Sequence, residues 1–372
     1  MKTLVFPSEF IDNKGGVPQT IIELVRGLAH HNDFKIVLIC PASSEMAKTT
    51  FPENVQVVTT SSRWHISRTS WLRTLETIIE VYIKLKPFLG EDSWVVTNHS
   101  VTSSLISLMP LRHVKEIYIN RGGEFSDKGA ASRLLLRKIK KSKISYAVGI
   151  SQRQVTLLIN SGIPKDKVFL IHDGLPLPQI QYKKTSLTTD LLRISTMGFI
   201  SDLKNQVEGV RLIQMLRANG VNAFLNIYGG VAEENYHKKL LTLIRELDVT
   251  DYVKIHGFVS GERLFDDTDV LVSFSKSEGF GRTLVEAMLR YKPVIAWQGA
   301  GGPIDITENG KYGYLVENNA ALDYFNVVMS MLHNTDNCMK NVEESYQYAL
   351  LNFTTEGMVR KYNDFFLSVC DR

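Results

Sequence analysis

The segment "VLVSFSKSEGFGRTLVEAM", residues 270–288, joins an apolar run to a glycine-rich turn and then to an apolar run of different periodicity. The first run, "VLVSF", has the continuous apolar pattern of a strand buried on both faces, whereas the residues after Arg282 follow helical spacing. A strand, a loop and a helix in this order are one half of a unit in which helices cover a parallel sheet. The segment therefore predicts a parallel α/β fold.

The same alternation runs along most of the chain. The apolar pattern predicts strands at 3–7, 34–40, 55–60, 94–97, 115–120, 146–151, 192–200, 223–230, 253–259, 270–275, 293–298 and 313–316, and only helices after Asn319. Two prolines and a Thr/Ser cluster predict a linker at about 174–189. At 372 residues the chain is too long for one ordinary domain. We therefore expect two doubly wound, Rossmann-like parallel-sheet domains, residues 1–180 and 190–353, facing a central cleft.

Composition places the chain among soluble globular proteins, with 44% hydrophobic and 22% charged residues. No apolar run reaches the roughly 18 residues of a spanning helix. The start, "MKTLVFPSEF", predicts a first strand and not a signal peptide. The cysteines, Cys40, Cys338 and Cys370, lack metal-ligand spacing, and their scarcity fits a reducing compartment. We expect a cytoplasmic protein.

Charge differs between the two halves. Residues 1–182 carry 23 Lys and Arg against 15 Asp and Glu, a net of +8, and the remainder carries 20 against 24, a net of −4. Residues 128–165 contain no acid, and Leu134, Leu135 and Ile139 lie among the basic residues there. A solvated helix face is one interpretation, and contact with an anionic membrane surface, peripheral at the inner face of the plasma membrane, is another. The acidic second half argues against a nucleic-acid partner.

The residues of 270–288 suit an anionic, sugar-bearing ligand. Ligands of doubly wound folds bind at the carboxyl ends of the strands, where this glycine-rich turn lies. The amides of residues 280–283 and the Arg282 guanidinium are donors for a phosphate. Glu286, one turn into the helix, can accept hydrogen bonds from a ribose diol, and Glu278 can bind hydroxyls beyond the phosphates. The alternative is a pair of solvated glutamates around an ordinary helix start.

Further segments make a resemblance specific. "SEGFGRTLVEAM" with "KPVIAWQGAGGPIDITENGKYGYLVEN" resembles the nucleotide-sugar half of family-four glycosyltransferases, which have the GT-B fold and an E-x7-E motif. "NKGGVPQTIIELVRGLA", "KDKVFLIHDGLPL", "STMGFISDLKNQVEG", "LNIYGG" and "VKIHGFVSGERL" resemble other parts of that family, in its order. The resemblance implies retaining, metal-independent transfer of a hexosyl unit from a nucleotide-diphosphate sugar, without a cofactor. It also implies that a helix at about 354–372 packs back on the first domain.

The resemblance assigns roles to residues of this sequence. Glu278, Lys204 and Arg121 are the expected catalytic residues. The expected donor-binding residues are Gly15, Gly16, Lys204, Gly229, Phe258, Glu278, Phe280, Gly281, Arg282, Thr283, Leu284 and Glu286. The expected acceptor-side residues are His99, Asn120 and Arg121. A glycan or lipid-linked acceptor of bacterial lipopolysaccharide, O-antigen or capsule synthesis is the expected partner.

The sequence departs from that family at two places. The arginine that usually follows the glycine of "MGFI" is Phe199 here, so Arg282 is a candidate to replace its charge. The histidine that many members carry near the reacting sugar is missing from "IYINRGGEFS", residues 117–126, which leaves Arg121, or His99 of "VVTNHS", as candidates. A non-catalytic relative and a nucleotide-sugar epimerase of the same fold are therefore alternatives. A nicotinamide dehydrogenase would need G-x-G-x-x-G after the first strand, which is absent.

Overall fold

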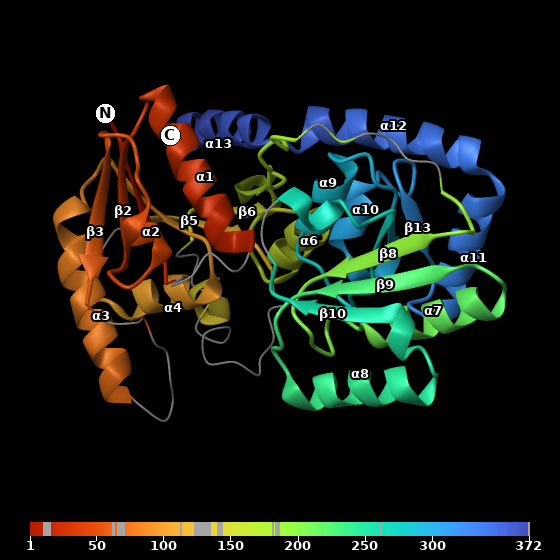
Figure 1. Ribbon diagram of the computed structural model, residues 1–372. Helices are drawn as coiled ribbons and strands as arrows, with labels where there is room; N and C mark the ends of the chain where they lie inside the picture. The colour runs from red at the N-terminus through yellow and green to blue at the C-terminus, as the bar shows by residue number, and fades with distance from the viewer. Residues whose placement is uncertain are drawn as a thin grey trace. The chain divides into compact units, whose positions relative to one another are not determined.

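The chain passes between two units at two points, Gly174/Leu175 and Thr354/Thr355. The computed structural model describes residues 1–9, 16–61, 64, 71–111, 114–122, 135–139, 144–180, 182, 187–259 and 262–370. The N-terminal unit comprises Met1–Gly174 with Thr355–Arg372, and the C-terminal unit comprises Leu175–Thr354 (Figure 1). At the crossing, the Leu175 amide donates to the Phe353 carbonyl at 2.8 Å, so the two connecting segments lie side by side.

Parallel strands form the sheet of the N-terminal unit, in the order β3-β2-β1-β4-β5-β6-β7. Its strands are β1 Thr3–Pro7, β2 Lys35–Pro41, β3 Val55–Thr60, β4 Ser93–Thr97, β5 Lys115–Asn120, β6 Tyr146–Gly149 and β7 Val168–Leu170. Its helices are α1 Gly16–His31, α2 Glu45–Lys48, α3 Trp71–Leu85, α4 Ser100–Leu108, α6 Gln152–Asn160 and the last helix of the chain, α13 Thr355–Cys370. The α13 helix packs on α1, and the Phe366 ring meets the rings of Phe6 and Phe34 edge-on at centroid distances of 6.4 and 6.1 Å.

The C-terminal unit repeats the design with the order β10-β9-β8-β11-β12-β13, again with parallel neighbours. Its strands are β8 Leu192–Met197, β9 Ala223–Tyr228, β10 Val253–Gly257, β11 Val270–Ser273, β12 Val294–Trp297 and β13 Tyr314–Val316. Its helices are α7 Val207–Ala218, α8 Glu234–Glu246, α9 Arg282–Met288, α10 Gly302–Ile306, α11 Ala321–His333 and α12 Thr335–Asn352. The predicted pair of doubly wound parallel sheets is thereby confirmed.

Each sheet has a point where its strand order reverses. In the N-terminal unit this point lies between β1 and β4, and in the C-terminal unit it lies between β8 and β11. The connections from these neighbouring strands run to opposite sides, which leaves room for a ligand beyond their carboxyl ends. Functional side chains are therefore expected after these four strands.

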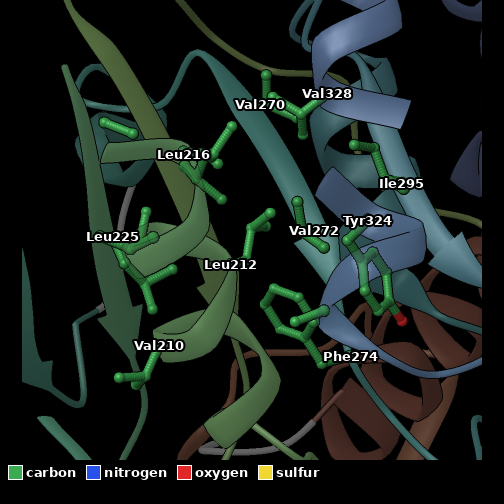
Figure 2. Packing of buried hydrophobic residues seen from close by; sticks show 14 of the residues in the cluster. Val210, Leu212, Leu216, Leu225, Val270, Val272, Phe274, Ile295, Tyr324 and Val328 are labelled. Carbon is green, nitrogen blue, oxygen red and sulfur yellow. The ribbon is translucent and has the colours of Figure 1, made fainter. Parts of the chain in front are cut away.

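The core of the C-terminal unit fixes its strands in register (Figure 2). Leu212 and Leu216 of α7 pack among Leu225 of β9 and the β11 residues Val270 and Val272, all fully or almost fully buried. Beyond β11, the Phe274 ring meets the Tyr324 ring of α11 at 4.8 Å, and the Tyr324 hydroxyl donates to Asn319 Oδ1 at 2.8 Å. This packing sets where the chain leaves β11 toward the glycine-rich turn.

Lys138, in the basic segment 128–165, is buried inside the protein instead of facing solvent or a membrane. The Lys138 side chain is 4% exposed and pairs with Glu116, whose side chain is 1% exposed. Lys138 Nζ also donates to the Ser103 carbonyl at 2.9 Å, and Glu116 Oε1 accepts from the hydroxyls of Thr97 and Ser103. The prediction of a membrane-facing side chain at Lys138 is therefore wrong, because β5 supplies a buried carboxylate for it.

The apolar residues beside Lys138 also point inward. Leu135 and Ile139 are buried against Tyr118, Ala147 and Leu158 and are not available to lipid. Residues 128–134 and 140–143 of the same segment, including Lys140 and Lys141, lie outside the described residues. In the part of the chain that the structure describes, no helix is both long and apolar enough to cross a membrane.

We predict that Lys138→Ala destabilises the N-terminal unit by about 3–5 kcal/mol, because it leaves the buried Glu116 carboxylate without its counter-charge. Lys340→Ala, which removes an exposed lysine 3.9 Å from Glu344, should cost less than about 1 kcal/mol. Urea unfolding followed by tryptophan fluorescence measures both changes. Equal midpoints for the two variants would contradict the structural role of Lys138.

Candidate active site

A close backbone approach organises the carboxyl edge of the C-terminal sheet. Gly198 and Gly229 follow β8 and β9 with φ values of +147° and +150°. The Gly198 amide donates to the Tyr228 carbonyl at 2.8 Å, and a Cβ on Gly229 would lie 1.9 Å from the Gly198 carbonyl oxygen. Only a residue without a side chain fits at 229, so the loops after the two strands are held in contact.

Lys204 and Glu278 form an ion pair at the reversal point between β8 and β11. The alkyl chain of Lys204 lies over Gly198, with Cε 3.1 Å from the place a Cβ would take there. Its Nζ is 2.5 Å from Glu278 Oε1, and both side chains are partly exposed. The two residues predicted to hold the donor are thus brought together, although 74 positions separate them.

The loop that carries Glu278 is fixed by its backbone on both sides. The Lys276 amide donates to the Leu203 carbonyl, and the Glu278 amide donates to the Ala300 carbonyl, both at 2.8 Å. The first bond ties the loop to the segment after β8, and the second ties it to the segment after β12. Glu278 is therefore held in place at the middle of the carboxyl edge.

Glu286 occupies a different environment on α9. Burial raises the pKa of its carboxyl, and the charges of Arg282 and Arg290 lower it by a smaller amount, so the pKa lies above the ordinary value. Its side chain is half-buried, and no described residue donates a hydrogen bond to the carboxylate. Binding of a ribose diol by this carboxylate stays a prediction.

The turn before α9 uses its apolar side chains for packing. Phe280 is buried with its ring 5.5 Å from that of Phe353, and Leu284 is buried beneath the turn. The Leu284 amide is occupied by the Gly281 carbonyl at 2.9 Å, and Gly281 caps the helix at φ +110°. The side chains of Phe280 and Leu284 belong to the core, and a donor-binding role for these two residues stays a prediction.

The remaining predicted donor residues lie at the ends of elements. Phe258, after β10, is exposed, and Arg282 and Thr283, which open α9, are half-buried. Phe199, where the family resemblance led us to expect an arginine, presents an exposed ring beside Gly230. In the N-terminal unit Gly16 begins α1, and Gly15 lies outside the described residues.

The N-terminal unit has its own ion pair where its strand order reverses. His99, which follows β4 and caps α4, has Nδ1 2.7 Å from Oε1 of Glu9, which follows β1. Burial lowers the pKa of His99, but the hydrogen bond to Glu9 and the charge of Glu9 together raise it by more. The pKa of His99 therefore lies above its ordinary value. The imidazole ring is partly exposed at the carboxyl edge of the sheet, and an acceptor-side role for His99 stays a prediction.

Arg121 and Asn120 are buried at the end of β5. The Arg121 side chain is 1% exposed and pairs with Asp173, and its Nε donates to Asn98 Oδ1 at 2.9 Å. Burial lowers the pKa of Arg121, but Asp173, Tyr362 and Glu23 together raise it by more. The Asn120 amide donates to Gln154. Arg121 thus joins the segments after β4, β5 and β7, and Asn120 joins the end of β5 to α6, while direct contact of Asn120 or Arg121 with a substrate stays a prediction.

Sequence reasoning missed the acidic partners of these cations. Glu9, Glu116 and Asp173 each lie far along the chain from the residue they pair with, and no spacing rule connects them. The available signal was position for Glu9, which follows the strand predicted at 3–7, whereas Asp173 follows β7, a strand that the apolar pattern did not predict. Among the described residues, no group of three or more His, Cys, Asp or Glu side chains is arranged to hold a metal ion.

Comparison with known proteins assigns a family to this site. Residues 180–348 match the family described as glycosyl transferases group 1. The chain carries a group 1 glycosyltransferase domain. The matched residues include Lys204, Glu278 and Glu286, so the ion pair and the open carboxylate both belong to the glycosyltransferase domain.

Relatives extend the match to part of the first unit. Poly(ribitol-phosphate) alpha-N-acetylglucosaminyltransferase of Staphylococcus aureus is 23% identical over 256 residues, which are 68% of this chain and 50% of that protein. Another relative, the GtfA subunit of a UDP-N-acetylglucosamine–peptide N-acetylglucosaminyltransferase of Streptococcus gordonii, is 34% identical over 25% of this chain and 18% of that protein. The chain thus spans half or less of the length of these two relatives.

Solved structures match the fold along the whole chain. Sucrose-phosphate synthase of Thermosynechococcus elongatus has a TM-score of 0.81 at 15% identity and covers 99% of both chains. Anabaena Alr3699/HepE, solved in complex with UDP and glucose, has a TM-score of 0.77 at 18% identity, over 99% of this chain and 100% of that one. These likenesses confirm the GT-B class of fold for this chain.

We predict that Gly229→Ala destabilises the C-terminal unit by more than about 2 kcal/mol, because a Cβ meets the Gly198 carbonyl and the positive φ strains alanine. Gly230→Ala is the matched control, since a Cβ there would lie 4.0 Å from the Phe199 ring. Thermal unfolding compares them. If Gly229→Ala unfolds at the temperature of Gly230→Ala, the contact does not hold the loops.

Proposed function

We propose that this chain is a retaining hexosyltransferase that takes a sugar from a nucleotide-diphosphate sugar and gives it to a glycan or lipid-linked acceptor of a bacterial envelope. The observation that carries the proposal is the Lys204–Glu278 pair at the reversal point of the glycosyltransferase domain, with the Glu286 carboxylate, to which no described residue donates a hydrogen bond, on the neighbouring helix α9. A uridine nucleotide sugar is the first donor to test, because the Anabaena neighbour was solved with UDP and glucose.

The charges near the edge suit a departing nucleoside diphosphate. As the bond between the anomeric carbon and the phosphate oxygen breaks, negative charge grows on the diphosphate, and fixed cations stabilise it. Lys204 and Arg282 supply those cations in the proposal. Glu278 keeps Lys204 oriented while its second oxygen accepts a hydrogen bond from a sugar hydroxyl. Glu286 accepts hydrogen bonds from the ribose diol.

The proposed transfer needs no side-chain base. The acceptor hydroxyl oxygen bonds to the anomeric carbon on the face from which the diphosphate leaves, and its proton passes to the departing phosphate oxygen. The configuration at the anomeric carbon is therefore retained. The envelope acceptor is supported by the name of the Staphylococcus aureus relative, which acts on poly(ribitol-phosphate).

We predict that the purified chain, given its donor and acceptor, releases nucleoside diphosphate at an unchanged rate in EDTA and forms a product of retained configuration. Diphosphate release and NMR of the product measure these two properties. Loss of turnover in EDTA that Mn²⁺ restores would contradict the metal-free mechanism. Formation of an epimerised nucleotide sugar from the donor alone would favour an epimerase instead.

We predict that Glu286→Ala raises the Kd for the donor nucleotide about ten- to hundredfold, because a hydrogen bond to a charged group contributes roughly 1.5–3 kcal/mol. Glu344→Ala on α12, an exposed carboxylate paired only at 3.9 Å, should leave the Kd unchanged. Isothermal titration calorimetry measures both variants. A wild-type Kd for Glu286→Ala removes this residue from the nucleotide site.

A further inference from the structure

Two ion pairs of opposite direction bridge the loops that follow β8 and β11. Lys204 of the first loop pairs with Glu278 of the second, whereas Lys276 of the second loop pairs with Asp202 of the first, with Nζ 2.7 Å from Oδ2. The side chains of Lys276 and Asp202 are 43% and 62% exposed, against 23% and 16% for Lys204 and Glu278. We name Lys276 and Asp202 the outer pair.

The backbone places Lys276 beside Lys204. The Lys276 amide donates to the Leu203 carbonyl at 2.8 Å, and Leu203 is the residue between Asp202 and Lys204. Two ammonium groups on flexible four-carbon chains therefore start from neighbouring points of the carboxyl edge. A ligand that Lys204 binds at this edge lies near Lys276 as well.

The outer pair costs little to open. Ion pairs between exposed side chains contribute only a small amount to stability, because water solvates both charges when they separate. The Lys276 ammonium can therefore exchange the Asp202 carboxylate for an anion of higher charge. The terminal phosphate of a nucleoside diphosphate is such an anion, with a charge of about −1.5 to −2 at pH 7.

The charges at this edge give a reason for the exchange. Lys204 is already paired with Glu278, and Phe199 stands where the family resemblance predicts a guanidinium. A departing nucleoside diphosphate gains negative charge as the sugar leaves, and cations held nearby stabilise that charge. A further cation at the edge would supply what Phe199 does not.

We propose that Lys276 leaves Asp202 when a nucleoside diphosphate occupies this edge, and that it then donates to a phosphate oxygen as a third cation with Lys204 and Arg282. Asp202 is the counter-ion of Lys276 when no phosphate is bound, so Asp202 opposes diphosphate binding. This inference rests on the proposed function, because it names a further residue of the same donor site. The alternative is a permanent surface ion pair that joins two loops and does not contact the ligand.

Isothermal titration calorimetry with UDP, GDP and ADP tests the role of Lys276. For the nucleotide that the wild type binds, Lys276→Ala should raise the Kd about five- to twentyfold, because the lost charge-assisted hydrogen bond outweighs the cost of opening the outer pair. Lys276→Arg keeps a mobile cation and should stay within about threefold of the wild type. The matched control is Lys340→Ala, which removes a lysine from an exposed pair with Glu344 and should leave the Kd unchanged.

The acid of the outer pair gives a test of opposite sign, because its removal should strengthen binding. Asp202→Asn should lower the Kd about two- to fivefold, which is the effect of no longer having to open an exposed ion pair. In the Lys276→Ala background the same substitution should change the Kd by less than about 1.5-fold, since no lysine remains to be released. Glu344→Gln is the matched control and should have no effect.

Thermal unfolding establishes that the variants are folded, since every side chain that is changed is exposed. Equal Kd values for Lys276→Ala and Lys340→Ala would overturn the inference and leave the proposed function intact. Unchanged or weaker binding by Asp202→Asn, or an equal change in both backgrounds, would make the outer pair a permanent contact and overturn the exchange. Failure of the wild type to bind any of the three nucleotides would overturn the proposed function, and this inference with it.

Discussion

The contact between the Gly198 carbonyl and Gly229 is the constraint on which the carboxyl edge of the C-terminal sheet depends. A Cβ at 229 would lie 1.9 Å from that oxygen, so the approach exists only because the residue is glycine. With the loop after β8 fixed, the Lys204 chain can lie over Gly198 and reach Glu278. Backbone hydrogen bonds join the loop after β11 to the loops after β8 and β12. The contact at Gly229 therefore supports the position of all these loops at the carboxyl edge.

Four charge pairs in this protein divide by exposure into two kinds. Lys138–Glu116 and Arg121–Asp173 are buried, and breaking either leaves a charge without solvent or partner. Lys204–Glu278 and His99–Glu9 are partly exposed, and pairs of that kind contribute little to stability. Each of these two partly exposed pairs, Lys204–Glu278 and His99–Glu9, lies where the strand order of its sheet reverses. Their position and their small effect on stability together suit ligand binding, whereas the buried pairs suit the fold.

The sequence predicted what depends on local pattern and missed what depends on distant partners. Apolar strands alternating with helical runs were sufficient for both parallel sheets, and the glycine-rich turn was sufficient to locate Glu278 and Glu286. The burial of Lys138 was not predictable, because it requires Glu116 on a strand that only the folded sheet brings near. The same holds for Arg121 and Asp173. The spacing of Leu72, Leu75, Ile79 and Ile83 is visible in the sequence, but only the packing of Val81 and Leu85 shows which face of the helix is outside.

The charge balance at the proposed donor site follows from one replacement. Phe199 puts an exposed ring where the family resemblance predicts a guanidinium, so the nearby cations are Lys204 and Arg282. With both Glu278 and Glu286 ionised, two cations face two carboxylates, and the edge attracts a diphosphate weakly. Burial raises the pKa of Glu286, and the charges of Arg282 and Arg290 lower it by a smaller amount. We infer that Arg282 matters more here than in a relative with the arginine, because Phe199 supplies no guanidinium to share the diphosphate with it.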